Sequence, residues 1–249
     1  MKPEPNRDAP PTDTIGGTAA TYILGRSKWG GPHKAYRKLC SMDPVIPPTS
    51  RMLRGIKLED AIAQAAQPYF HKRGRHIGEL LGSGVIYHPE HSCIHSTIDR
   101  MVYDESGKPV GICEIKTFDS TRNQFDWSRH DYWTQTAHYG TVLSAAEGCE
   151  LTEFYLTVLA APETQFNVFL SIQDSLGKDA LVEVLSRDFP SYLRTSIECG
   201  VENIVNIDNY ARDVIPQLVG WYDKHIRNRL VPDPDGSDEC KKTLLEMRG

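Results

Sequence analysis

The chain has 249 residues and a formal net charge of −5, and 39% of its residues are hydrophobic and 24% charged. This composition is ordinary for a soluble globular protein with one large domain, and the acidic balance disfavours non-specific coating of nucleic acid, which usually needs a basic surface. No apolar run approaches the roughly 18 to 20 residues of a membrane span, so we expect no membrane-spanning segment.

Helical and β patterns alternate along the first half of the chain. Helices are expected at residues 15–25 after a Gly-bounded turn, at 31–40 and at 54–70. A basic loop, HKRGRH, follows at 71–76. Strands are expected at residues 84–88, 98–104 and 110–117. The segment DESGKP (104–109) has turn chemistry, so we expect it to join the last two strands as a hairpin.

The second half of the chain continues this mixture. Helices are predicted at residues 132–147, 179–189 and 209–230, the last with Pro216 as a kink, and strands at 153–161 and 166–172. The mixture favours an α/β fold with a mixed central β-sheet flanked by helices. We assign one folded domain to residues 15–235, with a flexible Pro-rich lead-in (1–14) before it and a C-terminal tail (236–249) after it.

The cysteines and the N-terminus bear on the cellular compartment. The six cysteines lie far apart and form no CxxC pair, which argues against a zinc ribbon or an iron–sulfur clamp. The lead-in has no apolar core, so it does not resemble a signal peptide. We therefore expect a cytoplasmic protein with free thiols.

The stretch GICEIKT (111–117) carries the first sign of chemistry. Side chains alternate along a strand, so Glu114 and Lys116 share one face of an otherwise apolar segment. Asp99 starts the preceding strand, which the hairpin places alongside. Two carboxylates and the backbone carbonyl of Ile115 form an oxygen site suited to Mg²⁺ or Mn²⁺. A neighbouring lysine can orient a water molecule and offset charge in a transition state. A surface hairpin with a cross-strand ion pair, worth less than about 1 kcal/mol, would show the same short pattern.

Six segments along the chain make the pattern more specific. They are IGGTAATYILGRSKWGGPHKAY (15–36), RGIKLED (54–60), HPEHSCIHSTIDRMV (88–102), GICEIKT (111–117), YWTQTAHY (132–139) and RLVPDPD (229–235). In this order they resemble the lambda-exonuclease-like, or YqaJ-type, phage recombinase nucleases, a branch of the PD-(D/E)XK nucleases. The resemblance covers about residues 15–235 and implies a PD-(D/E)XK restriction-endonuclease-like core.

The same resemblance implies a function and partners. Members of the family are exonucleases that use Mg²⁺ or Mn²⁺ and resect the ends of double-stranded DNA in phage-type recombination. We therefore expect a single-strand annealing protein as a partner and a ring-shaped trimer that encircles DNA. The implied location is the cytoplasm of a bacterial or phage-infected cell.

The metal-binding and catalytic positions of the family carry over residue by residue. Its helix motif Gly-x-x-x-Glu falls on Gly55 and Glu59, so Glu59 would add an acidic group near the metals. Its metal-binding Asp falls on Asp99. Its Glu-x-Lys falls on Glu114 and Lys116, with the intervening carbonyl as a further metal ligand.

Other positions of the family match less completely. The Gln of the following helix falls on Gln135, where it would position the water or the phosphate, and the Ser or Thr of the turn near the DNA end falls on Thr18. Ile98 stands where a Pro often precedes the metal-binding Asp. No arginine nearer than Arg7 precedes the N-terminal turn, although the family often anchors a 5′-phosphate with one there. Dependence on a 5′-phosphate is therefore left open.

Basic and aromatic side chains outside the strands are candidates for DNA contact. A basic residue after the first helix could replace the missing arginine, a tryptophan beside it could stack on a base or wedge a duplex end, and the loop HKRGRH could bind the DNA backbone. A packing role for the tryptophan and a solvated loop are the alternatives. The candidates are Arg26, Lys28, Trp29, Lys72, Arg73 and Arg75.

Two alternatives concern metal type and function. His91, Cys93 and His95 alternate and could share a strand face that binds Zn²⁺, or they could be ordinary surface residues. A PD-(D/E)XK endonuclease in defence or restriction would cut closed circular DNA, which an exonuclease cannot. A non-catalytic DNA-binding or inhibitory protein on the same fold is the other rival, and the intact acidic and lysine positions argue against it.

Overall fold

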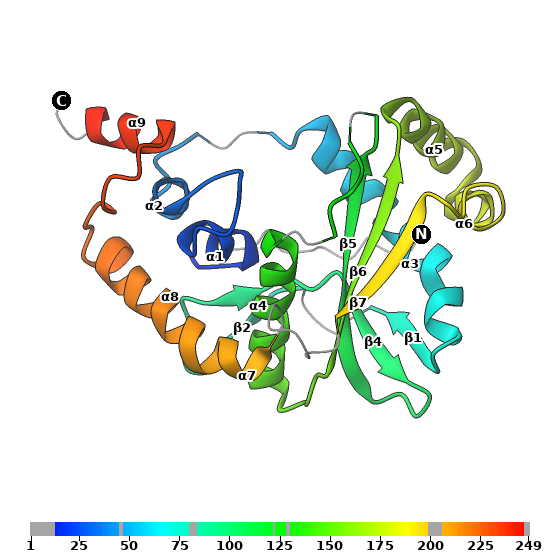
Figure 1. Cartoon of the computed structure of the whole chain (residues 1–249), viewed down its shortest axis with the longest axis horizontal. Coiled ribbons are helices and arrows are strands. Elements are labelled where there is room, and N and C mark those ends of the chain that lie inside the picture. Colours follow the sequence, from blue (N-terminus) through cyan, green and yellow to red (C-terminus); the bar gives the residue numbers. More distant parts are fainter. Residues whose placement is uncertain are drawn as a thin grey trace.

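The computed structural model describes residues 13–44, 47–79, 84–121, 123–127, 130–198 and 206–246. Most of the predicted lead-in, including Arg7, lies outside these residues. Within the described ranges, no helix is both long enough and apolar enough to cross a membrane. These ranges form an α/β structure in which helices flank a curled mixed sheet, as the element pattern predicts (Figure 1).

The main sheet has five strands in the order β1-β4-β5-β6-β7. They are β1 (Arg75–Gly78), β4 (Arg100–Asp104), β5 (Pro109–Asp119), β6 (Glu153–Ala161) and β7 (Leu193–Glu198). The β5–β6 pair is parallel, as a helical crossover allows, and the other neighbours are antiparallel. Two short strands, β2 (Ile86–Tyr87) and β3 (His95–Ser96), pair separately.

A tight turn closes the β4–β5 hairpin, as DESGKP predicts. Asp104 Oδ1 accepts hydrogen bonds from the backbone N–H groups of Ser106 and Lys108, each at 2.9 Å. Gly107 has a φ of 81°, a left-handed conformation that favours glycine. The resulting register pairs Arg100 with Cys113. The start of β4 therefore lies beside the middle of β5, where the predicted acid and base are located.

Helices lie on both sides of the sheet (Figure 1). One side carries α3 (Ser50–His71), α5 (Glu163–Leu176) and α6 (Lys178–Arg187). The other side carries α4 (His130–Glu147) and α1 (Gly17–Ile23). Farther from the sheet on this side are α2 (Pro32–Leu39), α7 (Ile207–Asn209), α8 (Ile215–Tyr222) and α9 (Asp238–Glu246).

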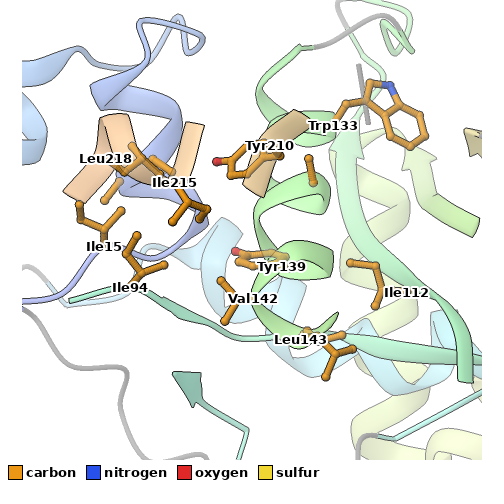
Figure 2. Packing of buried hydrophobic residues seen from close by; sticks show 14 of the residues in the cluster. Ile15, Ile94, Ile112, Trp133, Tyr139, Val142, Leu143, Tyr210, Ile215 and Leu218 are labelled. Atoms are coloured by element: carbon orange, nitrogen blue, oxygen red, sulfur yellow. The ribbon is translucent and has the colours of Figure 1, made fainter. Parts of the chain in front are cut away.

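Two hydrophobic clusters fill the space on the two sides of the sheet, and β5 contributes to both. Ile112 belongs to the cluster on the α4 side, which also contains residues of α1 and α8 and includes Tyr139 and Val142 of α4 (Figure 2). Cys113 and Ile115 pack with residues of α3, α5 and α6. Because side chains alternate along a strand, the even-numbered residues of β5 face α4. The charged residues at 114 and 116 therefore interrupt the apolar face that packs on α4.

One predicted strand is wrong. Residues 166–172 lie inside α5 rather than in a strand. Phe166 and Phe169 are fully buried, whereas Val168 is 47% exposed. Burial at a spacing of three residues is the period of a helix, and the local run of apolar residues obscured it.

The C-terminal part of the chain differs in detail from the prediction. The helix expected at 209–230 is interrupted by two π-helical segments, η1 (Tyr210–Val214) and η2 (Asp223–Arg227), on either side of α8. Pro216 lies in the first turn of α8, where its missing N–H removes a helical hydrogen bond. Residues 238–246 of the predicted tail form α9, which packs on α2. The sequence patterns also missed β1, β3 and β7, of which β1 takes up the end of the basic segment predicted as a loop.

Candidate active site

The β4–β5 register brings Asp99 to the charged segment of β5. Asp99 directly precedes β4, and the pairing of Arg100 with Cys113 places it opposite Glu114. Its Oδ2 accepts a hydrogen bond from the backbone N–H of Ile115 at 2.8 Å. This bond fixes the carboxylate against β5, on the face that Glu114 occupies. The predicted convergence of these side chains is thus present in the structure.

Glu114 and Lys116 form a partly buried ion pair beside α4. The Glu114 side chain is only 4% exposed and that of Lys116 is 25% exposed. The Lys116 ammonium contacts Glu114 Oε1, and Lys116 Nζ lies 5.4 Å from the centroid of the Tyr132 ring. The lysine is therefore the member of the cluster that reaches toward solvent, while the carboxylate lies at the bottom.

The electrostatics of the cluster show that two carboxylates are crowded together. Burial raises the pKa of Asp99 well above its usual value, and the nearby carboxylates of Glu114 and Glu59 raise it further. Burial lowers the pKa of Lys116, but the charges of Glu114 and Asp99 outweigh this effect and hold that pKa above its usual value. The lysine therefore stays protonated at neutral pH. One ammonium group does not fully compensate the buried carboxylate of Glu114 and the partly buried one of Asp99, so the site favours a further cation or a proton.

The donor atoms at this site fit a hard divalent cation. Two carboxylates and the adjacent carbonyl of Ile115 supply oxygen ligands of the kind that Mg²⁺ and Mn²⁺ prefer. Burial is the main cause of the raised pKa of Asp99, and the carboxylates of Glu114 and Glu59 add to it; a bound cation would relieve this repulsion. The residues present are therefore suited to such an ion.

One face of α4 covers the cluster. Tyr132, Gln135 and Tyr139 lie at positions i, i+3 and i+7 of this helix and so share a face. Both tyrosines interact with Lys116, and Gln135 is buried between them. The predicted position of Gln135 next to the acidic residues is thus consistent with the structure. The sequence analysis missed Tyr139, although the i+7 spacing within YWTQTAHY was available as a signal.

The N-terminal IGG turn packs directly on α4. A Cβ atom added at Gly17 would lie 2.6 Å from Cε1 of Tyr139, and one at Gly16 would lie 2.7 Å from Nε2 of His95. Both positions therefore require glycine for close approach. Thr18 follows in α1 and is half-buried, with its carbonyl accepting a hydrogen bond from Thr21 Oγ1 at 2.8 Å. The turn thus supports the wall formed by α4.

Glu59 approaches the site from the α3 side of the sheet and is engaged by a buried arginine. Arg100 Nη1 donates to Glu59 Oε1 at 2.7 Å, and Arg100 Nη2 donates to Asp60. Arg100 is only 3% exposed. Among the described residues, no group of three or more Asp, Glu, His or Cys donors converges here, so Glu59 does not join Asp99 and Glu114 as a third converging carboxylate. Arg100 was not identified by the sequence analysis, although it directly follows Asp99.

Three of the candidate DNA contacts lie together after α1. Trp29 is 60% exposed, and Lys28 Nζ lies 5.0 Å from the centroid of its ring. Arg26 is exposed and its Nη1 donates to Thr134 Oγ1 at 3.4 Å, on the turn of α4 that precedes Gln135. This segment therefore presents positive charge and an aromatic surface near the N-terminal end of α4.

The other three candidate contacts lie at the opposite end of β4. Arg75 pairs with Asp104 in the β1–β4 register and forms an ion pair with Glu153. Arg73 stacks on the Tyr69 ring at 3.7 Å, and Lys72 is exposed at the end of α3. A shallow cavity of about 400 Å³ there is lined by Arg73, Gly74, Arg75, Asp104, Glu105 and Ser106. The structure therefore separates these basic residues from Asp99 by the length of β4.

Of the alternatives left open for His91, Cys93 and His95, the zinc site does not form among the described residues. Among the described residues, the donor atoms of His91, Cys93 and His95 are not brought together. His95 instead shares a hydrogen bond of 2.8 Å between its Nδ1 and Thr14 Oγ1, and its carbonyl accepts one from His138 Nε2 at 2.9 Å. His95 therefore has a structural role, attaching the N-terminal turn to α4.

Comparisons with known proteins place the sequence of this chain in a family. The family model of the YqaJ-like viral recombinase domain matches residues 11–145, which is more than half of the chain. The Uncharacterized protein YqaJ of Bacillus subtilis (strain 168) is 31% identical over 150 residues. The match covers 58% of this chain and only 43% of that relative. The region matched by the family model includes Asp99, Glu114, Lys116 and Gln135.

Proposed function

Because this chain belongs to the YqaJ-like viral recombinase domain family, we propose that it is a metal-dependent DNA nuclease. The family is related to nucleases of phage-type recombination, and the finer proposal is an exonuclease that degrades double-stranded DNA from its ends. The observation that carries the proposal is the pair of neighbouring carboxylates, the partly buried Asp99 and the buried Glu114, beside the protonated Lys116. An ordinary surface hairpin would not bury this combination.

Asp99, Glu114 and the carbonyl of Ile115 would hold one or two Mg²⁺ or Mn²⁺ ions. When bound, such an ion polarises the phosphodiester and lowers the pKa of a water molecule. The two carboxylates would supply the negative charge that retains the ion. The surrounding protein would exclude competing water, and electrostatic interactions are stronger where water is excluded.

Lys116 and Gln135 would act on the attacking water and the phosphate. The Lys116 ammonium keeps its proton, so it can donate hydrogen bonds but cannot serve as a base. Its charge would stabilise the extra negative charge of the pentavalent phosphorus transition state. Gln135 lies on the facing surface of α4 and would position the same groups through its amide.

The segment after α1 is the proposed contact for the DNA end. Trp29 would stack on the terminal base pair, and Arg26 and Lys28 would bind a backbone or terminal phosphate. These residues offset locally the net negative charge of the chain, which would otherwise repel DNA. A single-strand annealing protein as partner and a trimeric ring remain part of this proposal.

Digestion of matched linear and closed circular duplexes tests the proposal. The expected result with Mg²⁺ or Mn²⁺ is progressive loss of the linear duplex, an intact circle, and no cleavage in EDTA. Asp99→Asn should be inactive, whereas Asp174→Asn, which changes an exposed carboxylate on α5, should match the wild type. Linear substrates with 5′-phosphate and 5′-hydroxyl ends would measure the phosphate dependence.

The other outcomes separate the rival functions. Cleavage of the closed circle would favour an endonuclease of defence or restriction. Binding of DNA without cleavage of either substrate, with both metals, would refute the nuclease proposal and favour a non-catalytic binding protein. Activity that survives in Asp99→Asn would refute the assignment of the site.

A further inference from the structure

A second group of metal-ligating side chains lies far from the carboxylate pair, where α9 packs on α2. It consists of His33 in the first turn of α2, Asp235 in the loop before α9, and Cys240 in the first turns of α9. One donor atom from each residue lies within 4.8 Å of the other two. Figure 1 shows α9 and α2 at one edge of the molecule, with α1 and α4 between them and the sheet.

The hydrogen bonding of His33 leaves one ring nitrogen available for a ligand. Nε2 lies 3.2 Å from the carbonyl oxygen of Asp233. A carbonyl oxygen only accepts, so Nε2 carries the hydrogen and Nδ1 of the neutral ring has a lone pair. His33 is fully buried, and its Nδ1 has no hydrogen-bond partner among the described residues. A histidine whose other nitrogen donates to a backbone carbonyl is the usual arrangement of a metal ligand.

One serine holds the Asp235 carboxylate and the backbone at Cys240. Ser237 donates from its N–H and its hydroxyl to Asp235 Oδ1, at 3.0 and 2.6 Å. Its hydroxyl oxygen also accepts a hydrogen bond from the backbone N–H of Cys240 at 3.0 Å. Oδ2 of Asp235 faces Gly31, where an added Cβ would lie 3.0 Å away. These bonds hold the Asp235 carboxylate and the start of α9 at the entrance of α2.

We propose that His33, Asp235 and Cys240 bind a zinc ion that fastens α9 to α2. A nitrogen, a carboxylate oxygen and a thiolate suit Zn²⁺, whereas Mg²⁺ and Mn²⁺ favour oxygen ligands alone. Bond lengths of about 2.0–2.3 Å around a tetrahedral ion place donor atoms roughly 3.3–3.8 Å apart. The observed group needs only a small contraction to reach that geometry. Asp235 is exposed, so water takes the fourth position.

The zinc-bound helix also supports the proposed DNA contact. Lys34 Nζ donates to the carbonyl of Trp29 at 2.6 Å and lies 3.7 Å from Glu239 of α9. The position of α9 therefore influences the loop that carries Trp29. This consequence rests on the proposed function, whereas the zinc site itself does not.

Zinc content and affinity of the full chain test the site directly. Purified protein, stripped with a chelator and re-equilibrated with Zn²⁺, should bind about one ion per chain. Co²⁺ in its place should give a thiolate-to-cobalt charge-transfer band. Loss of an outer-shell partner costs about 10–100-fold in affinity, so loss of a ligand should cost at least about 100-fold. Cys240→Ser should lose the charge-transfer band and the tight binding.

Matched variants keep the test independent of folding and of nuclease activity. Asp235 is exposed, so Asp235→Asn should fold normally yet lose zinc and the zinc-induced rise in melting temperature. Asp238→Asn, which changes an exposed carboxylate in the same part of α9, should bind zinc as the wild type does. Asp99→Asn should also retain zinc, whatever happens to DNA cleavage. Wild-type protein without tight zinc, or variants Asp235→Asn and Cys240→Ser with unchanged affinity, would overturn the proposal.

Discussion

Replacement of Lys116 by alanine separates a catalytic lysine from an ordinary strand lysine. The side chain is 25% exposed and contacts a carboxylate that is 4% exposed. An exposed ion pair, such as Lys57 with Asp174 at 3.2 Å, contributes about 0–1 kcal/mol to stability and nothing to catalysis. If Lys116 acts on charge that develops only in the transition state, its loss should slow cleavage about 10²–10³-fold, or about 2.7–4 kcal/mol.

The same variant should also lose stability, by an amount that the geometry brackets. Removal of one partner of a fully buried ion pair costs about 3–5 kcal/mol, because the other charge is left uncompensated. Lys116 is partly exposed, so we expect about 1–3 kcal/mol, between the exposed and the buried limits. Adding Glu114→Gln to Lys116→Ala should restore much of this stability without restoring cleavage.

Single-turnover cleavage and gel-shift binding on one linear duplex measure the catalytic effect. Lys116→Ala should bind DNA nearly as well as the wild type, since a group that acts in the transition state contributes little to ground-state affinity. Excess Mn²⁺ should not rescue it, although Mn²⁺ could partly rescue Asp99→Ala. Lys57→Ala is the control for removal of a lysine charge. Cleavage by Lys116→Ala within about threefold of the wild type, roughly 0.65 kcal/mol, would refute this account of the site.

Four other residues, Asp99, Arg37, His95 and His138, lead to further expectations. Asp99→Asn should abolish cleavage yet raise the free energy of unfolding in metal-free buffer at pH 8, because the pKa of Asp99 is raised in the folded state. A carboxyl group with a raised pKa in the folded state lowers the stability of the protein as the pH rises from its unfolded to its folded pKa. Equal melting temperatures of the variant and the wild type at pH 8 would contradict the reasoning. Arg37 is fully buried between two partly exposed carboxylates. The substitution Arg37→Met should lower the free energy of unfolding by about 1.5–3 kcal/mol, because charged hydrogen bonds are lost. Urea unfolding would measure it, and Arg212→Ala, which removes an exposed arginine, should unfold as the wild type does. Burial lowers the pKa of His95 and of His138 to about 4. Stability should therefore fall as the pH drops below about 6.5, because these rings then protonate in the unfolded chain. Each histidine should lower the free energy of unfolding by at most about 1.4 kcal/mol per pH unit. Stability should level off near pH 4, and an NMR titration midpoint near 6.5 in the folded protein would contradict this.

The carboxylate site could be predicted because its geometry is local. Glu114 and Lys116 share a face through strand alternation alone, and Asp99 reaches them through one hairpin whose turn residues are recognisable in the sequence. The parts of the site that sequence patterns missed come from other elements. Tyr139 reaches Lys116 because α4 crosses over the β5 face. Arg100 contacts Glu59 because α3 packs on the opposite side.

Failures of the element prediction have a similar cause. The segment 166–172 is apolar enough for a strand, and only its packing against α3 and α6 shows that Phe166 and Phe169 are buried at helical spacing. The residues of α9 form a polar, tail-like sequence with few apolar side chains. The helix is held by contacts to α2, among them the ion pair of Arg37 with Glu246. Such contacts join residues about 200 positions apart, and no local pattern encodes them.

By itself, the sequence determined the α/β class, the β4–β5 hairpin and the oxygen-rich character of the candidate site, because turn chemistry and side-chain alternation act over a few residues. Only the tertiary structure decided which cationic residues lie near that site. It placed Arg26 at the start of α4 and Arg75 at the far end of β4. It also brought His33 and Cys240 together from opposite ends of the chain while leaving His91, Cys93 and His95 apart. The physical reason is that donor atoms converge only where packed elements hold them within a few ångströms, and that packing depends on the whole core.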